Sequence, residues 1–221
     1  MIEELVIEKF KQIKYLELKN LSKINIFVGN NGCGKTTLLD YIYKDNYKNA
    51  YNYECFMETY YDKHKNETIK LLNIFYPYIK DIKNNSIDNK MYLVTDDFNK
   101  IYINDMGTGF LEIFCFIIEN IFCNKYKNSV VTIDNFGNNL DFLSLSKLIK
   151  LMRECTKKNN TQFFISTNNI EMISALINIY DNKDDTTNRF VNYYYLSNDN
   201  SNHSVFKYDI DTLLKKTRFP S

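Results

Sequence analysis

The chain has 221 residues, 44% hydrophobic and 25% charged, a composition that excludes wholesale disorder and suits one α/β domain. The 28 basic and 27 acidic residues give a formal net charge of +1, so no strong overall field favours nucleic acid or an anionic membrane. Five cysteines without paired metal-ligand spacing favour free thiols and a cytoplasmic location. Only six glycines are present, so backbone that needs glycine is confined to a few places.

The first half of the chain predicts short strands around one glycine-rich loop. Strands are expected over 3–8, 14–18, 24–28, 91–95 and 100–103. Helices are expected over about 35–43 and around 66–82. Residues 45–66 are rich in Tyr and Asn and show no clear periodicity.

The second half alternates strands with helices, which favours a largely parallel sheet with covering helices. Strands are expected over 129–133, 162–166, 190–196 and 204–208. Helices are expected from the Gly107-Thr108-Gly109 segment to about 123, over 142–152 and 170–177, and near 210–216.

The segment Gly29-Asn30-Asn31-Gly32-Cys33-Gly34-Lys35-Thr36 matches the phosphate-loop pattern G-x-x-x-x-G-K-[ST] in full. Glycines let backbone N–H groups turn toward phosphate oxygens, and the start of the following helix adds its positive dipole end. Lys35 is expected to reach the β- and γ-phosphates, the Thr36 hydroxyl to ligate Mg²⁺, and Thr37 to touch the α-phosphate. An ordinary strand-to-helix turn is the alternative, but it would not need three of six glycines.

A second metal-binding group is expected at Asp134, which ends the apolar strand Val130-Val131-Thr132-Ile133 and can hold Mg²⁺ through water. The other interpretation of Asp134 is a helix cap or a turn residue. Most enzymes of this kind place a glutamate next, but here the residue is Asn135, whose amide can hold a water without accepting its proton. Loss of a general base commonly costs about 10²–10⁴-fold in rate.

Together these segments resemble the ABC/SMC-type P-loop ATPases, especially the compact RecF-like and OLD-like branch of AAA-family ATPases. The resemblance rests on the opening IEKFKQIKYLEL, the phosphate loop INIFVGNNGCGKTTLLD, the signature-like INDMGTGFLEIFCFI, the Walker B strand and D-loop VVTIDNFGNNLD, and the switch strand TQFFISTNNIEMISAL. It covers roughly residues 1–180.

The resemblance implies one ABC-type nucleotide-binding domain over 1–221, with a mixed sheet flanked by helices. A small helical insert over 45–104, too short for coiled-coil arms, would separate the phosphate loop from the signature. The signature, Walker B, D-loop and switch would follow over 105–221.

The resemblance also implies a dimer that sandwiches MgATP, in which each γ-phosphate is touched by the partner's signature helix. Gly107, Thr108 and Gly109 would take this role, and paired glycines at a helix start also form an anion site on physical grounds. A tight turn entering a core helix is the alternative. Asp141 would end the D-loop and contact the nucleotide, and Lys11 is either a phosphate-proximal cation or a solvated charge.

Several departures from the family pattern concern hydrolysis. Asn135 stands at the glutamate position, Asn168 stands at the switch histidine position, and no glutamine lies between the phosphate loop and the signature. The two histidines, His64 and His203, lie elsewhere and are expected at the surface. The catalytic positions are therefore Lys35, Asn135 and Asn168, with MgATP binding intact and hydrolysis slowed.

The leading interpretation is an ATP- and Mg²⁺-binding ATPase domain that dimerises with itself or a related subunit and regulates a partner protein. DNA maintenance and antiphage defence are the settings that the resemblance implies. DNA binding is unsupported by the net charge, and no membrane association is expected. The alternatives are a non-hydrolysing ATP-binding structural subunit, a fully active ATPase with an unconventional base, and a transporter-associated ATPase.

Overall fold

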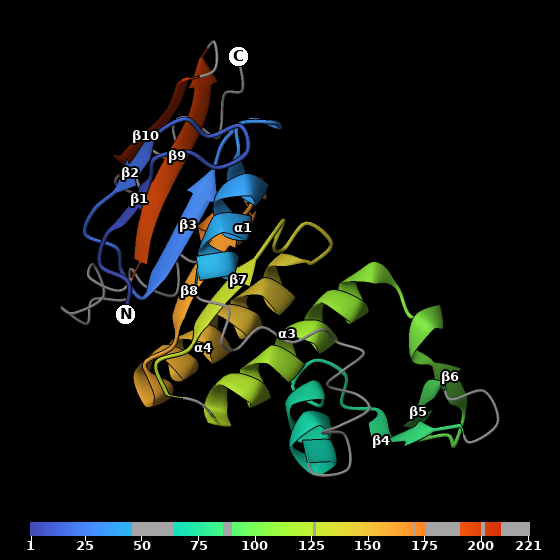
Figure 1. Cartoon of the computed structure of the whole chain (residues 1–221). Helices are drawn as coiled ribbons and strands as arrows, with labels where there is room; N and C mark the ends of the chain where they lie inside the picture. Colours follow the sequence, from blue (N-terminus) through green and yellow to red (C-terminus); the bar gives the residue numbers. More distant parts are fainter. Residues whose placement is uncertain are drawn as a thin grey trace. The chain divides into compact units, whose positions relative to one another are not determined.

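The computed structural model describes residues 1–45, 64–85, 90–125, 127–169, 171–175, 191–199 and 202–208. The chain forms two compact units, one made of Met1–Ala50 with Tyr126–Ser221 and the other of Tyr51–Lys125 (Figure 1). The expected single domain with an insert over 45–104 stays a prediction.

The first unit is built on a five-stranded mixed sheet with the order β10-β9-β3-β8-β7. Its strands are β3 (Ile24–Val28), β7 (Val130–Ile133), β8 (Gln162–Ser166), β9 (Val191–Asp199) and β10 (Asn202–Tyr208). β3 pairs in parallel with β8 and β9, β7 pairs in parallel with β8, and β10 runs antiparallel to β9. The predicted α/β class with a mixed sheet is therefore confirmed.

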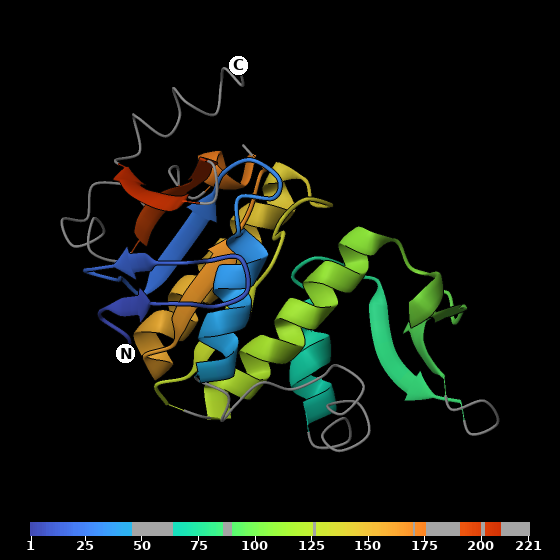
Figure 2. The same ribbon diagram turned by 45° about the horizontal axis from the view of Figure 1, so that its top comes forward.

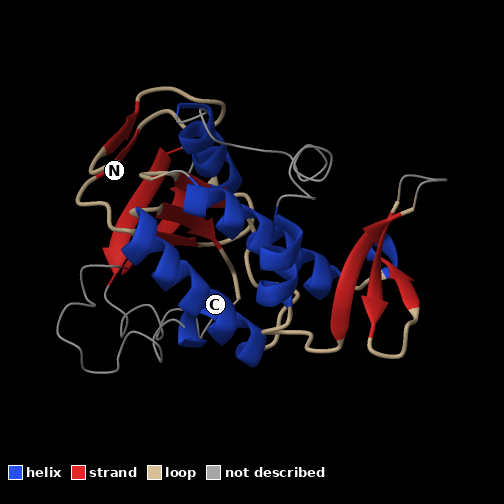
Figure 3. Cartoon of the chain, turned by 90° about the horizontal axis from the view of Figure 1, so that it is seen from below, coloured by secondary structure: helices blue, strands red, loops and turns tan. Residues whose placement is uncertain are grey.

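Two helices, α1 (Lys35–Asp45) and α4 (Phe142–Asn159), cover opposite faces of this sheet (Figures 2 and 3). The connection from β3 to β7 crosses the sheet in one direction, and the connection from β7 to β8 returns in the other. Because crossovers between parallel strands are right-handed, the helices in the two connections fall on opposite faces. Parallel strands also bring the residues that follow β3, β7 and β8 to the same edge.

The core under α1 explains why the loop before this helix is held in place. The hairpin of β1 (Leu5–Ile7) and β2 (Leu16–Leu18) pairs antiparallel, and its inward residues join the apolar residues of α1 in one buried cluster. Phe27 of β3 lies in that cluster and stacks against Tyr194, with ring centroids 5.4 Å apart. Burial of apolar surface stabilises a fold by roughly 25 cal/mol per Å². Because β3 and α1 both pack into this cluster, the loop between them is held at both of its ends.

The second unit contains an antiparallel sheet of β4 (Ile79–Asn84), β5 (Met91–Thr95) and β6 (Lys100–Tyr102). A short 3-10 helix, η2 (Ile103–Asp105), leads into the long helix α3 (Thr108–Lys125). Residues 64–72 are also helical.

The expected helix over 66–82 is wrong in its second half, because the helix ends at residue 72 and β4 follows. Pro77 lacks a backbone N–H and cannot continue the helix. Ile79 and Ile82 are both fully buried although they lie three residues apart. A β-bulge at Lys80, between Ile79 and Asp81, turns both isoleucines to the same side, so a strand imitates helical spacing.

The other predicted strands are present, and each begins and ends within a few residues of the expected bounds. Of the helix expected over 170–177, residues 171–175 are described and helical. The helix expected near 210–216 and most of the segment over 45–66 lie outside the described residues.

Candidate functional site

The glycine-rich loop between β3 and α1 encloses the ammonium group of Lys35. The Lys35 Nζ atom donates to the carbonyl oxygens of Gly29 at 2.7 Å and Asn30 at 3.1 Å. The Lys35 side chain is only 7% exposed. A cation held this way inside a loop of backbone amides at a helix start provides a site for an anion.

Two glycines of this loop leave little room for a side chain. A Cβ atom on Gly29, whose φ is +150°, would lie 2.3 Å from the carbonyl oxygen of Leu196. A Cβ atom on Gly34, whose φ is +101°, would lie 3.0 Å from the ring of His203. Left-handed backbone and close approach together require glycine at both positions.

Thr36, at the start of α1, is joined to Asp134 at the end of β7. The Thr36 hydroxyl donates to Oδ2 of Asp134 at 2.7 Å. The Ser166 hydroxyl and the Asn135 backbone N–H donate to the other oxygen, Oδ1. A hydroxyl and a carboxylate held together are the hard oxygen ligands that Mg²⁺ prefers, so the donor set fits this ion.

Asn135 has left-handed backbone, with a φ of +54°, and its side chain is exposed. Its backbone N–H donates to the Ser166 hydroxyl at 2.9 Å. Asparagine tolerates this conformation better than most residues. The amide therefore lies at the surface beside Asp134, at the edge where the loop after β3 also lies.

Asn168, which follows β8, reaches the glycine-rich loop directly. Its side-chain amide donates to the side-chain oxygen of Asn31 at 3.0 Å. Thr167 ties the same segment to β3 and β7, because its backbone N–H donates to Phe27 and its hydroxyl donates to the carbonyl of Phe136. The structure thus brings Asn31, Asn135 and Asn168 together at one sheet edge, while their chemical roles stay predictions.

Asp141 caps the N-terminus of α4. Its carboxylate accepts from the backbone N–H groups of Leu143 at 2.9 Å and Ser144 at 3.0 Å. The hydrogen bond from the Ser144 backbone is the main cause that lowers the pKa of Asp141. A charged N-cap of this kind stabilises a helix by about 0.5–2 kcal/mol. The expected contact of Asp141 with nucleotide stays a prediction.

Gly107, Thr108 and Gly109 belong to the second unit, where α3 begins at Thr108. Among the described residues, nothing lies within 4 Å of the place that a Cβ atom on Gly107 would take, and its backbone is not left-handed. Neither backbone conformation nor crowding within this part of the chain therefore requires glycine at position 107.

Two residues of the site were missed by sequence reasoning. Ser166 supports Asp134, and the end of the predicted strand 162–166 could have suggested it. His203 was expected at the surface, but its ring lies against Gly34 and both ring nitrogens are buried. His203 as a whole is partly exposed, and the antiparallel pairing of β10 with β9 carries this distant segment to the loop.

Within the residues that the structure describes, no group of three or more His, Cys, Asp or Glu side chains is placed to hold a metal ion by itself. No helix in the same ranges is long and apolar enough to cross a membrane.

Solved structures of SMC heads share this fold. The chain resembles an SMC head bound to the C-winged helix domain of ScpA with a TM-score of 0.66 at 12% identity, covering 96% of this chain and 99% of that one. It resembles the SMC head domain from Thermotoga maritima with a TM-score of 0.57 at 11% identity, covering 94% and 98%. No curated protein matches the chain significantly.

The fold and the phosphate loop define a P-loop ATPase domain of the ABC/SMC type. The model of the family described as "AAA domain, putative AbiEii toxin, Type IV TA system" matches residues 56–174, more than half of the chain. The chain belongs to this family of AAA domains. A second AAA-domain model matches residues 4–43, which include the glycine-rich loop.

Proposed function

We propose that this ATPase domain binds MgATP, that two copies close around the nucleotide, and that the ATP-bound dimer regulates a partner protein. Slow hydrolysis makes that dimer long-lived. The single observation that carries the proposal is the hydrogen bond of 2.7 Å between Thr36 and Asp134. It brings the phosphate loop and the acidic strand end together as an ATP site requires.

The hydrogen bonds of the Lys35 ammonium group support phosphate binding. This group is satisfied by the carbonyl groups of Gly29 and Asn30. Phosphate oxygens are charged acceptors and form stronger hydrogen bonds than neutral carbonyls do. Lys35 therefore exchanges these carbonyls for the β- and γ-phosphates when ATP enters the loop.

Thr36 and Asp134 would hold the magnesium ion. When bound, Mg²⁺ neutralises charge on the β- and γ-phosphates. The Thr36 hydroxyl, which now donates to Asp134, would serve as a ligand, and Ser166 and the backbone N–H of Asn135 would keep the Asp134 carboxylate oriented.

Slow hydrolysis follows from two amides. The Asn135 side chain can hold the attacking water but cannot take its proton. Asn168 already donates to Asn31 at 3.0 Å, so it can turn to the γ-phosphate as a donor without carrying charge. Both amides favour binding of ATP over its cleavage.

Dimerisation rests on the resemblance and on Gly107. Because the fold does not require glycine there, an open glycine before α3 suits close approach of a phosphate from a second copy. A similar structure, with a TM-score of 0.50 at 14% identity, comes from work on the ATP-driven dimerization of SMC ATPases. The ScpA domain bound to another SMC head is a precedent for a regulated partner.

A defence setting is supported by the family description, which names a toxin of a type IV TA system. DNA maintenance is the second setting, and it has no support from the net charge of +1. A non-hydrolysing subunit that keeps ATP as a fixed ligand remains the second candidate function, because both Asn135 and Asn168 lack an ionisable group.

Calorimetric titration with MgATP tests the proposal, with Lys35→Ala as the matched control. We expect saturable binding by the native chain and loss of binding by the variant. Multiple-turnover assays on the same samples separate the two candidates, because slow turnover supports the ATPase and no turnover supports the fixed ligand. Absence of ATP binding by the folded native chain would contradict both.

A further inference from the structure

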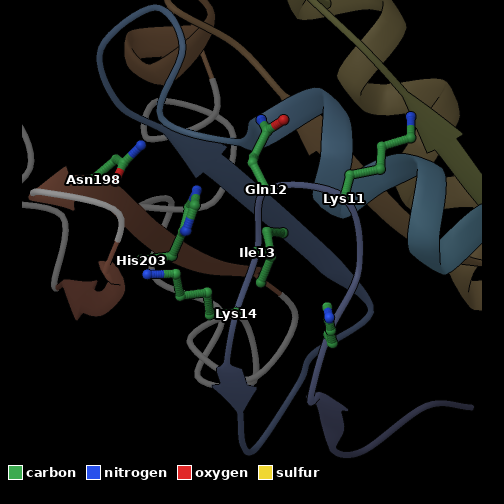
Figure 4. A pocket seen from close by; sticks show the side chains of 7 residues that line it. Lys11, Gln12, Ile13, Lys14, Asn198 and His203 are labelled. Carbon is green, nitrogen blue, oxygen red and sulfur yellow. The ribbon is translucent and has the colours of Figure 1, made fainter.

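A cavity of about 610 Å³ in the first unit adjoins the phosphate loop (Figure 4). Its lining residues come from the β1–β2 loop and the β9–β10 hairpin and include His203, which also lies against Gly34. This cavity therefore belongs to the ATP site proposed above. The second unit carries a separate feature, the turn between β5 and β6.

The turn between β5 and β6 is a loop of three residues, Asp96, Asp97 and Phe98. Thr95 and Asn99 close this loop, because the N–H of Thr95 donates to the carbonyl oxygen of Asn99 at 3.2 Å. The N–H of Phe98 donates to the carbonyl oxygen of Thr95 at 2.9 Å. The loop is therefore a hydrogen-bonded hairpin turn.

The turn is also fixed to the segment that leads into β4. The N–H of Asp96 donates to the carbonyl oxygen of Tyr78 at 2.9 Å. The Asp96 carboxylate pairs with the ammonium group of Lys80 at 2.7 Å. The turn therefore presents its side chains from a defined backbone.

Phe98 has left-handed backbone, with a φ of +59°. In hairpin loops of this length that position favours glycine, and asparagine also tolerates it. Among the described residues, six residues other than glycine have positive φ, and four of them are asparagine. A bulky aromatic residue in this conformation lowers the stability of the fold. Local folding therefore does not account for phenylalanine at this position.

The Phe98 side chain is 86% exposed, the largest exposed fraction of any large hydrophobic side chain in the described ranges. A side chain in water contributes none of the hydrophobic stabilisation that burial would give. Phe98 thus strains the backbone without packing into the part of the chain that the structure describes. Aromatic side chains that project from a rigid element are typical anchors of protein interfaces.

The carboxylates next to Phe98 indicate the kind of partner. Asp97 is exposed and directly precedes the ring, and Asp96 is half-exposed beside Lys80. These carboxylates repel phosphate groups, which disfavours nucleic acid and anionic membranes. A symmetric contact between two copies of this turn would bring their Asp97 carboxylates together, which also disfavours self-association. The charges fit a protein surface with basic side chains around an apolar pocket.

We propose that Phe98 anchors this domain to a different protein by inserting into an apolar pocket bordered by lysine or arginine. Tyr78, which is 39% exposed and adjoins the turn through its carbonyl group, extends the contact. The inference rests on the proposed function only because both require a partner protein. The strain at Phe98 is then a cost to the free domain that binding offsets.

Photochemical cross-linking tests what occupies this surface. Phe98 is replaced by p-benzoylphenylalanine in the full chain, which is irradiated in an extract of the cells that make it. The same replacement of Phe206, a phenylalanine that is 50% exposed, is the matched control. We expect position 98, and not position 206, to cross-link to one other protein. No cross-link, or cross-links only to nucleic acid, lipid, a second copy or another segment of the chain, would overturn the inference.

Calorimetry with the captured protein in purified form then measures the role of the ring. Phe98→Asn removes the ring and suits the left-handed backbone, so it should weaken binding at least tenfold while raising Tm by about 2–4 °C. Asp97→Lys should weaken binding at least threefold, and Phe206→Asn should change it less than twofold. Unchanged affinity of Phe98→Asn would overturn the inference. A fall in its Tm would do the same, because it would show that the ring packs within its own chain.

Titration with MgATP separates this inference from the proposed function. Native chain and Phe98→Asn should bind MgATP equally, because Phe98 is no part of the phosphate loop. A native chain that binds its partner through Phe98 but does not bind MgATP would refute only the proposed function. A chain that binds MgATP but has no partner at position 98 would refute only this inference.

Discussion

Replacement of Asn135 by glutamate should restore a general base to the site. The side chain is exposed beside Asp134, so a carboxylate there can reach a water near the metal site without displacing packed atoms. A positioned general base is worth about 10²–10⁴-fold in rate, which lowers the barrier by about 3–5 kcal/mol. We therefore expect Asn135→Glu to raise the rate of ATP cleavage by at least a hundredfold.

The same replacement has a structural cost that can be worked from the backbone. Asn135 has a φ of +54°, where a residue other than glycine or asparagine costs about 1 kcal/mol. For a chain of this size that is a fall in Tm of about 2–4 °C. This cost is small beside the stability of about 5–15 kcal/mol that is typical of a folded domain, so the variant should stay folded.

Single-turnover hydrolysis of MgATP measures this effect, and Asn135→Gln is the matched control. Glutamine has the length of glutamate and the same backbone strain, but it cannot accept a proton. Equal rates for the Glu and Gln variants would refute the reasoning that a missing base limits the reaction.

Three further predictions concern other residues of the chain. Ser166→Ala removes a hydrogen bond to Asp134 and should weaken MgATP binding about fivefold in calorimetry, and an unchanged affinity would contradict that role. Asp141→Ala should lower the free energy of unfolding by about 0.5–2 kcal/mol in urea titration, whereas Asp141→Asn, which keeps the capping oxygen, should change it little; equal losses would exclude the cap. Burial raises the pKa of Glu119 to about 7, so ionisation disfavours the fold and stability should fall as pH rises from about 4.5 to 7. Glu119→Gln should reduce the dependence of the free energy of unfolding on pH between about 4.5 and 7. The same pH dependence in the native chain and in the variant would contradict this prediction.

The phosphate loop could be predicted from sequence because its chemistry depends on adjacent residues. Gly34, Lys35 and Thr36 would act through backbone amides, an ammonium group and a hydroxyl, and these groups stand next to one another in the chain. The apolar strands that precede the loop and Asp134 could also be predicted from the sequence. Parallel pairing then brings the ends of β3, β7 and β8 to one edge without further information.

The strand β4 could not be predicted from its spacing alone. Ile79 and Ile82 lie three residues apart, which is the spacing of a helix face, and only the bulge at Lys80 makes this compatible with a strand. Pro77 was a local signal against a continuous helix. A bulge is fixed by the pairing partner β5, and a single strand does not reveal its partner.

His203 and Ser166 illustrate a second limit. Their roles arise from contacts across the sheet, with Gly34 and with Asp134, and no local pattern marks such pairs. The same limit applies to Asn31 and Asn168. The sequence identified Asn31 as a loop residue and Asn168 as a departure from the family pattern, but it did not predict the hydrogen bond between them. Local sequence patterns therefore predicted the phosphate loop, but they did not predict the contacts across the sheet that surround it.

The most direct test of the central claim is the solution mass of the purified chain with and without MgATP, measured by light scattering together with ATP turnover. We predict a monomer without nucleotide, a dimer with MgATP that persists for many minutes, and a monomer under both conditions for Lys35→Ala. A native chain that binds MgATP but stays monomeric would contradict the proposed sandwich dimer. Rapid turnover with immediate loss of the dimer would contradict the argument from Asn135 and Asn168.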